Sequence, residues 1–388
     1  MLDSVLDIFR MKQYFDAVNW TRDWVGTSVR DAQFVNASRR AVLPLPFERQ
    51  TPPGGNPFPA FRDHALPRLQ RRRFAFVSTG GSGALSAVIG CARAWEEAGV
   101  TPEVMSLCSG SGFFGFPIAA GLSSDEVAEF MLSLRPEDIV DMHWGGVARI
   151  AIGGRGFTGL INGEVVERTF RRLLGDMRLR DLRIPCYAPI WNVETDRLEY
   201  MGPSTYPDLP VAAAIRAAIA LPLFYEPAPI DGALWCDGGI VDIFPVRPVL
   251  DLDDPPDVVL AVNCFYPPGF AGEEVWGWER RMASIVHAAS QVRYAQQIEM
   301  ARVHLRLLTE RSEVLMTEPV PYSEVRGAGF YKQWFDHRDW PEFMRRGHHD
   351  AHAALRRWES RHAAPPVSRV RANGAAVARR AHRVHAVR

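Results

Sequence analysis

The sequence predicts an α/β fold in three layers, with a central, mostly parallel sheet and helices on both faces. Continuous apolar segments typical of buried strands occupy residues 74–79, 104–107 and 257–265. Segments with helical periodicity lie between them, and 47% apolar residues in a chain of 388 can bury a large core. Because strands that alternate with helices form parallel sheets, we expect functional residues at the strand ends.

The predicted elements follow one another from residue 74 onward. A glycine-rich turn and a long helix to about residue 98 follow the first strand, and the second strand leads into a helix after Ser109. The segment 123–134 begins with a Ser-Asp-Glu helix cap, and 165–175 is an amphipathic helix. Further expected elements are strands at 185–193 and 197–202 with a turn at 194–196, and helices at 211–224, 283–300 and 341–359.

Three regions of the chain differ in composition. Residues 1–72 combine an amphipathic helix at 2–25 with an arm rich in proline and glycine, 73–362 hold the alternating elements, and 363–388 carry arginines without acids. We expect one large domain in the middle region and disorder in the tail. The N-terminal helix either packs on its own domain, which the acids on its polar side favour, or lies on a membrane surface.

The overall composition argues against several classes of protein. A formal net charge of zero gives no general attraction for nucleic acid. The five cysteines lie singly, mostly in apolar segments, which indicates buried thiols rather than a disulfide framework or a zinc site. Apolar runs are interrupted well before the roughly 18 residues of a membrane span, and the start MLDSVLD lacks a basic signal segment. These features predict a cytoplasmic protein, with peripheral membrane contact as the alternative.

A glycine-rich loop follows the first predicted strand. Residues 79–83 (Thr-Gly-Gly-Ser-Gly) precede a helix, and glycines in such a place leave backbone N–H groups free to face an anion. A dinucleotide pyrophosphate could use the same loop. However, Ser86 stands where that fingerprint has its third glycine, and no acid ends a second strand at the expected distance. We therefore do not favour a dinucleotide site.

A serine turn follows the second predicted strand. The usual nucleophile elbow is Gly-x-Ser-x-Gly, because the sharp turn brings the flanking positions close together. Around Ser109 these two positions are Leu107 and Ser111. The segment alone fits a nucleophilic serine as well as it fits a helix start at which Ser109 or Ser111 caps free N–H groups.

An Asp-Gly-Gly turn at residues 237–239 is the third segment. Asp-Gly is common in tight turns, so this turn alone is weak evidence. Taken together and in this order, the three segments resemble the patatin-like phospholipase family, whose pattern is a glycine-rich oxyanion loop, a serine elbow and an Asp-Gly turn. Residues 213–246 are similar to the family's signature, and the likeness extends over about 74–265 and more weakly to about 359. The resemblance implies a patatin-like catalytic domain at 73–362.

The resemblance assigns chemical roles to residues of this sequence. It makes Ser109 the nucleophile and Asp237 its base, in a Ser-Asp dyad without histidine. Counting from Ser109, rather than from Ser111, brings Gly115 and the Ala-Ala-Gly at 119–121 into the family's register. The oxyanion hole that it implies is formed by the backbone of Gly80, Gly81, Ser82 and Gly110.

An aspartate can serve as this base only if its surroundings raise its pKa, since the ordinary value is about 3.9. We expect burial near the apolar residues Trp235, Ile240 and Phe244 to raise the pKa of Asp237. The serine needs such a base because its hydroxyl is too weak an acid to attack unaided.

The function that the resemblance implies is a serine acyl hydrolase of the phospholipase or lipid-esterase type. Its substrate would be a lipid or other acyl ester, and it would need no metal and no organic cofactor. An acyltransferase would use the same acyl-enzyme, and an inactive protein of this fold would bind a lipid or a partner. Two departures bear on the choice: the loop lacks the family's arginine, and Leu107 and Ser111 replace the elbow glycines.

Histidines provide two rival sites. A Ser-acid-His triad would need His287, which lies in a predicted helix and is expected to be a packed or surface residue. His348 and His352 stand one helical turn apart, as in some metal sites, but a third ligand is missing and a helix surface is favoured. Residues 143–159 are expected either to cover the site or to form a plain loop.

Overall fold

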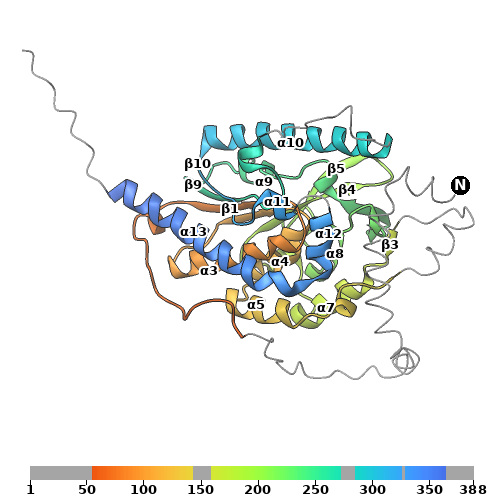
Figure 1. Ribbon diagram of the computed structural model, residues 1–388, viewed down its shortest axis with the longest axis horizontal. Coiled ribbons are helices and arrows are strands. Elements are labelled where there is room, and N and C mark those ends of the chain that lie inside the picture. Colours follow the sequence, from red (N-terminus) through yellow and green to blue (C-terminus); the bar gives the residue numbers. More distant parts are fainter. Residues whose placement is uncertain (1–54, 143–158, 272–284, 326–327, 364–388) are drawn as a thin grey trace, which may run out of the picture.

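The computed structural model of the protein describes residues 55–142, 159–271, 285–325 and 328–363. Within these residues an eight-stranded sheet forms the centre of the molecule (Figure 1). The strand order is β10-β9-β1-β2-β4-β8-β7, and β5 pairs with β4 beside this path. The predictions for residues 2–25, for 143–158 and for the tail concern parts of the chain outside the described residues.

The sheet is mixed and mostly parallel. Its parallel strands are β10 (Glu313–Thr317), β9 (Val258–Val262), β1 (Phe74–Ser78), β2 (Val104–Leu107) and β4 (Cys186–Asn192). The antiparallel strands are β8 (Ala233–Asp237), β7 (Ala228–Ile230) and β5 (Arg197–Met201). Two short strands, β3 (Gly159–Ile161) and β6 (Leu223–Tyr225), pair with each other apart from this sheet.

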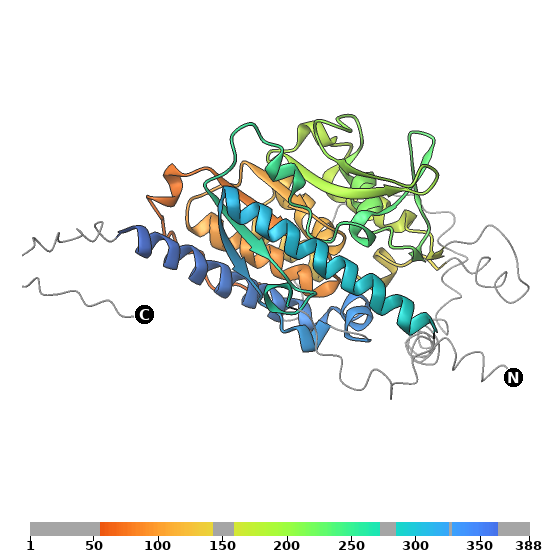
Figure 2. The ribbon, with the colours of Figure 1, turned by 90° about the horizontal axis from the view of Figure 1, so that it is seen from above.

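Helices cover both faces of the sheet (Figures 1 and 2). One face carries α9 (Arg247–Leu250) and the long α10 (Ile285–Arg311). The other face carries α3 (Ala87–Glu97), α4 (Gly110–Ala119), α5 (Ser124–Ser133), α7 (Glu164–Leu174), α8 (Val211–Ala218), α11 (Tyr322–Val325), α12 (Ala328–Phe335) and α13 (Trp340–Ala363). The three-layer α/β fold predicted from the sequence is confirmed.

Strand side chains alternate between two hydrophobic cores, as the two-residue period of a strand requires. In β1, Phe76 packs in the core beneath α3 and α4, whereas Val77 packs in the core beneath α10. In β9, Leu260 packs in the core beneath α3 and α4, and Val259 packs in the core beneath α10. Because both faces are covered, these strands read as continuous apolar runs rather than alternating ones.

One predicted helix ends earlier than expected. The sequence predicts a helix over 211–224, but α8 ends at Ala218, and Leu223–Tyr225 form β6. Pro222 explains the difference. Proline has no backbone N–H to donate to a helical hydrogen bond, and it disfavours helical geometry at the preceding Leu221. None of the described helices combines the length and the apolar character needed to cross a bilayer.

Two helices approach so closely that their backbones touch. A Cβ atom added to Gly90 of α3 would lie 1.9 Å from the Met344 carbonyl oxygen of α13. A Cβ atom added to Gly347 of α13 would lie 2.1 Å from the Ala87 carbonyl oxygen of α3. Glycine at both positions therefore permits this crossing, which anchors α13 against the first helix of the fold.

Replacing Gly90 by valine should lower the free energy of unfolding by at least about 1–3 kcal/mol, because a backbone carbonyl cannot move aside as a flexible side chain can. Denaturant unfolding measures the effect. His349→Ala is the matched control, since it lies on α13 with a side chain that is 82% exposed. Equal stability of Gly90→Val and the wild type would contradict the close crossing.

Candidate active site

The first two parallel strands bring the glycine loop and the serine turn together. Ser78 and Leu107, the last residues of β1 and β2, are paired in the sheet. The loop at 79–82 therefore leaves the same edge of the sheet as the turn that carries Ser109. This is the carboxyl edge, where open parallel sheets hold their functional groups.

The antiparallel strand β8 brings Asp237 to the same edge. Strands β2 and β4 are in register at Ser106 and Tyr187. Continuing that register for three residues places Ser109 level with Ile190. Ile190 is paired with Asp237, the last residue of β8. The two residues proposed as a dyad thus meet because β4 extends beyond the end of β2.

Ser109 occupies a strained turn between β2 and α4. Its backbone angles are φ 53° and ψ −125°, a region that residues with a side chain rarely adopt. A nucleophile elbow holds its serine in just such a strand-to-helix turn. The side chain is half-buried, makes no helix-capping hydrogen bond and lines a pocket.

Ser111, the second candidate serine, is fully buried. Its Oγ accepts a hydrogen bond from the Cys108 N–H at 2.7 Å and donates one to the Cys108 carbonyl at 2.8 Å. The hydroxyl is therefore used to tie the first turn of α4 to the end of β2. The sequence left open whether a serine here is a nucleophile or a structural cap, and Ser111 has the structural role.

Leu107, the other departure from the usual elbow, points into the core beside α4. A Cβ atom on Gly115 would lie 2.4 Å from Leu107 Cδ1, so this leucine fills the space beside the glycine. Leu107 is fully buried and does not line the pocket. It changes the packing under the turn rather than the walls of the site.

The glycine loop has fewer free N–H groups than expected. The Gly80 N–H donates to the Ile243 carbonyl at 2.9 Å, so the expectation that Gly80 contributes a free donor needs correction. In the described part of the chain, the N–H groups of Gly81, Ser82 and Gly110 have no backbone acceptor. These three remain the candidate donors.

The loop and the helix start are in direct contact. A Cβ atom on Gly110 would lie 2.5 Å from the Gly81 carbonyl oxygen, so a larger residue there would push the loop away. The hydroxyl of Ser82 donates to the Phe330 carbonyl at 2.5 Å, which holds the outer side of the loop. The start of α4, with its partial positive charge, faces the same space.

Asp237 is a buried carboxyl group with a raised pKa. Its exposed fraction is 1%, and burial raises its pKa from the ordinary 3.8 to about 7. Interaction with the Ser109 side chain and a hydrogen bond from the Gly239 N–H at 2.8 Å lower the pKa but do not cancel the effect of burial. An aspartate with a pKa near 7 can accept a proton at neutral pH.

The backbone after Asp237 touches both other parts of the site. The Ile243 carbonyl accepts the Gly80 N–H, and the Asp242 carbonyl lies 3.6 Å from the Cys108 thiol, next to Ser109. Residues 238–244 therefore connect Asp237 to the glycine loop and to the serine turn.

Side chains from β5 and α10 hold this segment, and the sequence analysis missed them. The Asp242 carboxylate is buried, accepts a hydrogen bond from Tyr200 and lies 3.1 Å from His304 Nδ1. Burial lowers the pKa of His304, but Asp242 and the Phe244 carbonyl raise it, and the net shift is upward. Gln297 donates to the Gly239 carbonyl at 2.7 Å.

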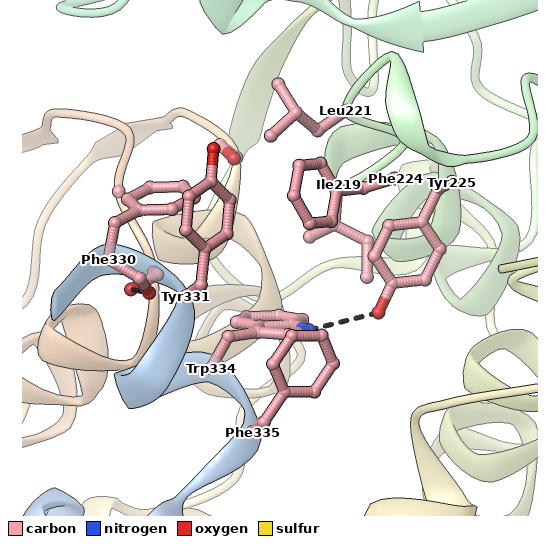
Figure 3. Close-up of a pocket in the computed structure, with 12 residues that line it drawn as sticks. Ile219, Leu221, Phe224, Tyr225, Phe330, Tyr331, Trp334 and Phe335 are labelled. Carbon is pink, nitrogen blue, oxygen red and sulfur yellow. Dashed lines mark hydrogen bonds between the residues drawn. The ribbon is translucent and has the colours of Figure 1, made fainter. Parts of the chain in front are cut away.

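An aromatic pocket opens beside Ser109 (Figure 3). Glycine and serine residues of the loop and elbow form one side, and apolar or aromatic side chains form the rest: Ile219, Leu221, Phe224, Tyr225, Phe330, Tyr331, Trp334 and Phe335. The last four belong to α12, which was not predicted. The spacing of its aromatic residues, in pairs four apart, was the signal that could have revealed it.

The rival histidine sites find no support in the described residues. His348 Nε2 lies 2.8 Å from the Glu97 carboxylate, as one partner of a buried pair between α13 and α3. The side chain of His287 lies outside the described residues.

The segment that carries Ser109, Asp237 and the glycine loop is similar to a known family. Residues 77–250 match the Patatin family model, described as patatin-like phospholipase. This part of the chain is therefore similar to the patatin-like phospholipases, whose members are typically serine lipid hydrolases.

Curated relatives extend this similarity. Uncharacterized NTE family proteins of Mycobacterium bovis and Mycobacterium tuberculosis are 31% identical over 189 residues, which cover 48% of this chain and 48% of each relative. The chain thus aligns with about half the length of the curated relatives it matches.

Two solved structures give weaker matches. VipD from Legionella pneumophila aligns with a TM-score of 0.41 and 12% identity, over 83% of this chain and 73% of that one. The ExoU–SpcU complex from the type III secretion system of Pseudomonas aeruginosa aligns with a TM-score of 0.32 and 17% identity, over 61% and 52%.

Asp237→Asn should stabilise the protein above neutral pH. The folded pKa of about 7 exceeds the ordinary 3.8, so the wild type loses stability as the pH rises from about 4 to about 7 and the buried group ionises. Asparagine carries no such charge. Denaturant unfolding at several pH values should show a stability gain for the variant that grows over this range, at about 1.4 kcal/mol per unit of pKa shift, and then levels off. A pH-independent difference would contradict the raised pKa.

Proposed function

We propose that this protein is a serine acyl hydrolase that cleaves lipid or other carboxylic esters through a covalent acyl-enzyme on Ser109. The observation that carries the proposal is the combination of a strained Ser109 with a buried Asp237 whose pKa is near neutrality. The similarity of residues 77–250 to the patatin-like phospholipases supports the reaction class. We further propose that residues 73–362 act as one catalytic unit, because α10 and α13 pack in the same cores as the family segment.

The first half of the reaction acylates the serine. Asp237 accepts the proton of the Ser109 hydroxyl as its oxygen bonds to the ester carbonyl carbon. The N–H groups of Gly81, Ser82 and Gly110 are the proposed donors to the resulting oxyanion, and loss of one such donor typically costs about 3 kcal/mol. The carbon–alkoxy bond then breaks, and the alcohol leaves with the proton from Asp237.

Water completes the reaction. Asp237 takes a proton from a water molecule that attacks the acyl carbon, the bond to Ser109 breaks, and the proton returns to the serine. The carboxylic acid is released and the enzyme is restored. An alcohol in place of the water would make the same intermediate an acyl donor.

A fluorophosphonate probe tests the nucleophile. The wild type should be labelled, Ser109→Ala should not, and Asp237→Asn should be labelled at least about a hundredfold more slowly, because general-base catalysis contributes roughly 10²–10⁴-fold. Ser111→Ala is the matched control: it should keep its labelling and lose stability, since it removes two hydrogen bonds to Cys108. Absence of labelling in a folded wild type would overturn the hydrolase, and labelling of Ser109→Ala would place the nucleophile elsewhere.

The pH profile of ester hydrolysis tests the base. Asp237 accepts a proton only when ionised, so kcat/KM should rise about tenfold per pH unit below pH 7 and level off above it, given the pKa of about 7. A profile that stays flat down to about pH 5 would show that Asp237 is not the base that limits the rate.

A further inference from the structure

The floor of the aromatic pocket is closed by a polar contact between two buried rings. The indole N–H of Trp334 donates to the Tyr225 hydroxyl at 3.1 Å, the dashed line in Figure 3. The Tyr225 hydroxyl in turn donates to the Ile139 carbonyl at 3.2 Å. Trp334 also packs edge-on against Phe113 of α4, with ring centres 5.0 Å apart. Hydrogen bonds and packing thus hold the floor in place.

The rim is narrowed by a second pair of rings. Phe224 of β6 and Tyr331 of α12 are stacked, with centres 4.8 Å apart and planes inclined by 15°. Both residues are half-buried, unlike the buried Tyr225 and Trp334 below them. The pocket is therefore bridged twice between the β6 segment and α12, once at the rim and once at the floor.

The space between these contacts is short and apolar. Its volume is about 40 Å³, well below the roughly 300–1,000 Å³ that small-molecule pockets span. No lysine, arginine, aspartate, glutamate or histidine is among the described residues that line it. A neutral apolar group attached to Ser109 fits these walls, whereas a long chain would have to separate one of the ring pairs.

We propose that this pocket receives the acyl group of the substrate and that its ring pairs restrict the enzyme to short acyl chains, such as acetyl and butyryl. The inference rests on the proposed acyl hydrolase function and adds the class of ester that it cleaves. Trp334 and Tyr331 are the specificity-determining residues. Both come from α12, which lies beyond the segment that matches the family.

A series of p-nitrophenyl esters tests the selectivity. The wild type should hydrolyse the acetate and butyrate with a kcat/KM at least tenfold above that for the decanoate and palmitate. Tyr331→Ala should open the rim, and Trp334→Leu the floor, so that each raises the decanoate-to-butyrate ratio at least fivefold. Phe61→Ala is the control for loss of an aromatic ring, because Phe61 is 55% exposed and does not line the pocket. Its ratio should match that of the wild type.

The selectivity is overturned if the wild type cleaves decanoate as fast as butyrate, or if both pocket variants change all esters in proportion. Tyr331 is half-buried, so its variant keeps the test valid if Trp334→Leu fails to fold.

Calorimetry on Ser109→Ala separates this inference from the proposed function. Binding of methyl butyrate but not of methyl decanoate supports the short pocket, whatever the activity of the wild type. If in addition no ester is hydrolysed and no serine is labelled, the proposed hydrolase is rejected and the short pocket is not. Equal or tighter binding of methyl decanoate overturns the short pocket while leaving the labelling result to decide the function.

Discussion

Residues 238–244 carry the interactions on which the geometry of the site depends. This stretch follows Asp237 directly. Its Ile243 carbonyl accepts the Gly80 N–H, and its Asp242 carbonyl lies beside the thiol of Cys108. The glycine loop, the turn at Ser109 and the Asp-Gly-Gly turn at 237–239 are far apart in sequence, and contacts with this one stretch of backbone position all three. The segment is itself held by buried polar groups, because Asp242 interacts with Tyr200 and His304. Hydrogen bonds in such buried surroundings are electrostatically stronger than the same bonds in water.

Burial of Asp237 raises the pKa of its carboxyl group and also makes the site costly to maintain. The same desolvation that raises the pKa of this carboxyl group to about 7 opposes its ionisation in the folded protein. Backbone strain at Ser109 also lowers the stability of the folded protein, since conformations in this region cost on the order of 1–3 kcal/mol. Packing in the two hydrophobic cores on either side of the sheet offsets both destabilising effects. The close crossing of α3 and α13 is part of this packing.

The sequence was most informative where a local rule determines the structure. The strand at 104–107, the turn at Ser109 and the capped helix α5 could be predicted because strand runs, elbows and caps depend on neighbouring residues. The role of Ser111 could not, since capping and nucleophilic serines look alike in a sequence. The loss of Gly80 as a donor and the contribution of α12 depend on contacts with residues more than a hundred positions away. Such contacts leave no local pattern.

Leu107 and Gly115 show how the departure from the usual elbow is compensated. The leucine occupies the space that a side chain at 115 would need, so the two positions share a single volume. Restoring glycine at 107 alone would leave a cavity under the turn, and enlarging 115 alone would create a clash. Each change is harmful without the other, which is sign epistasis between a strand and a helix. The two positions therefore constrain each other: glycine at 107 lowers stability unless 115 is enlarged as well, and the common motif would also need glycine at 111.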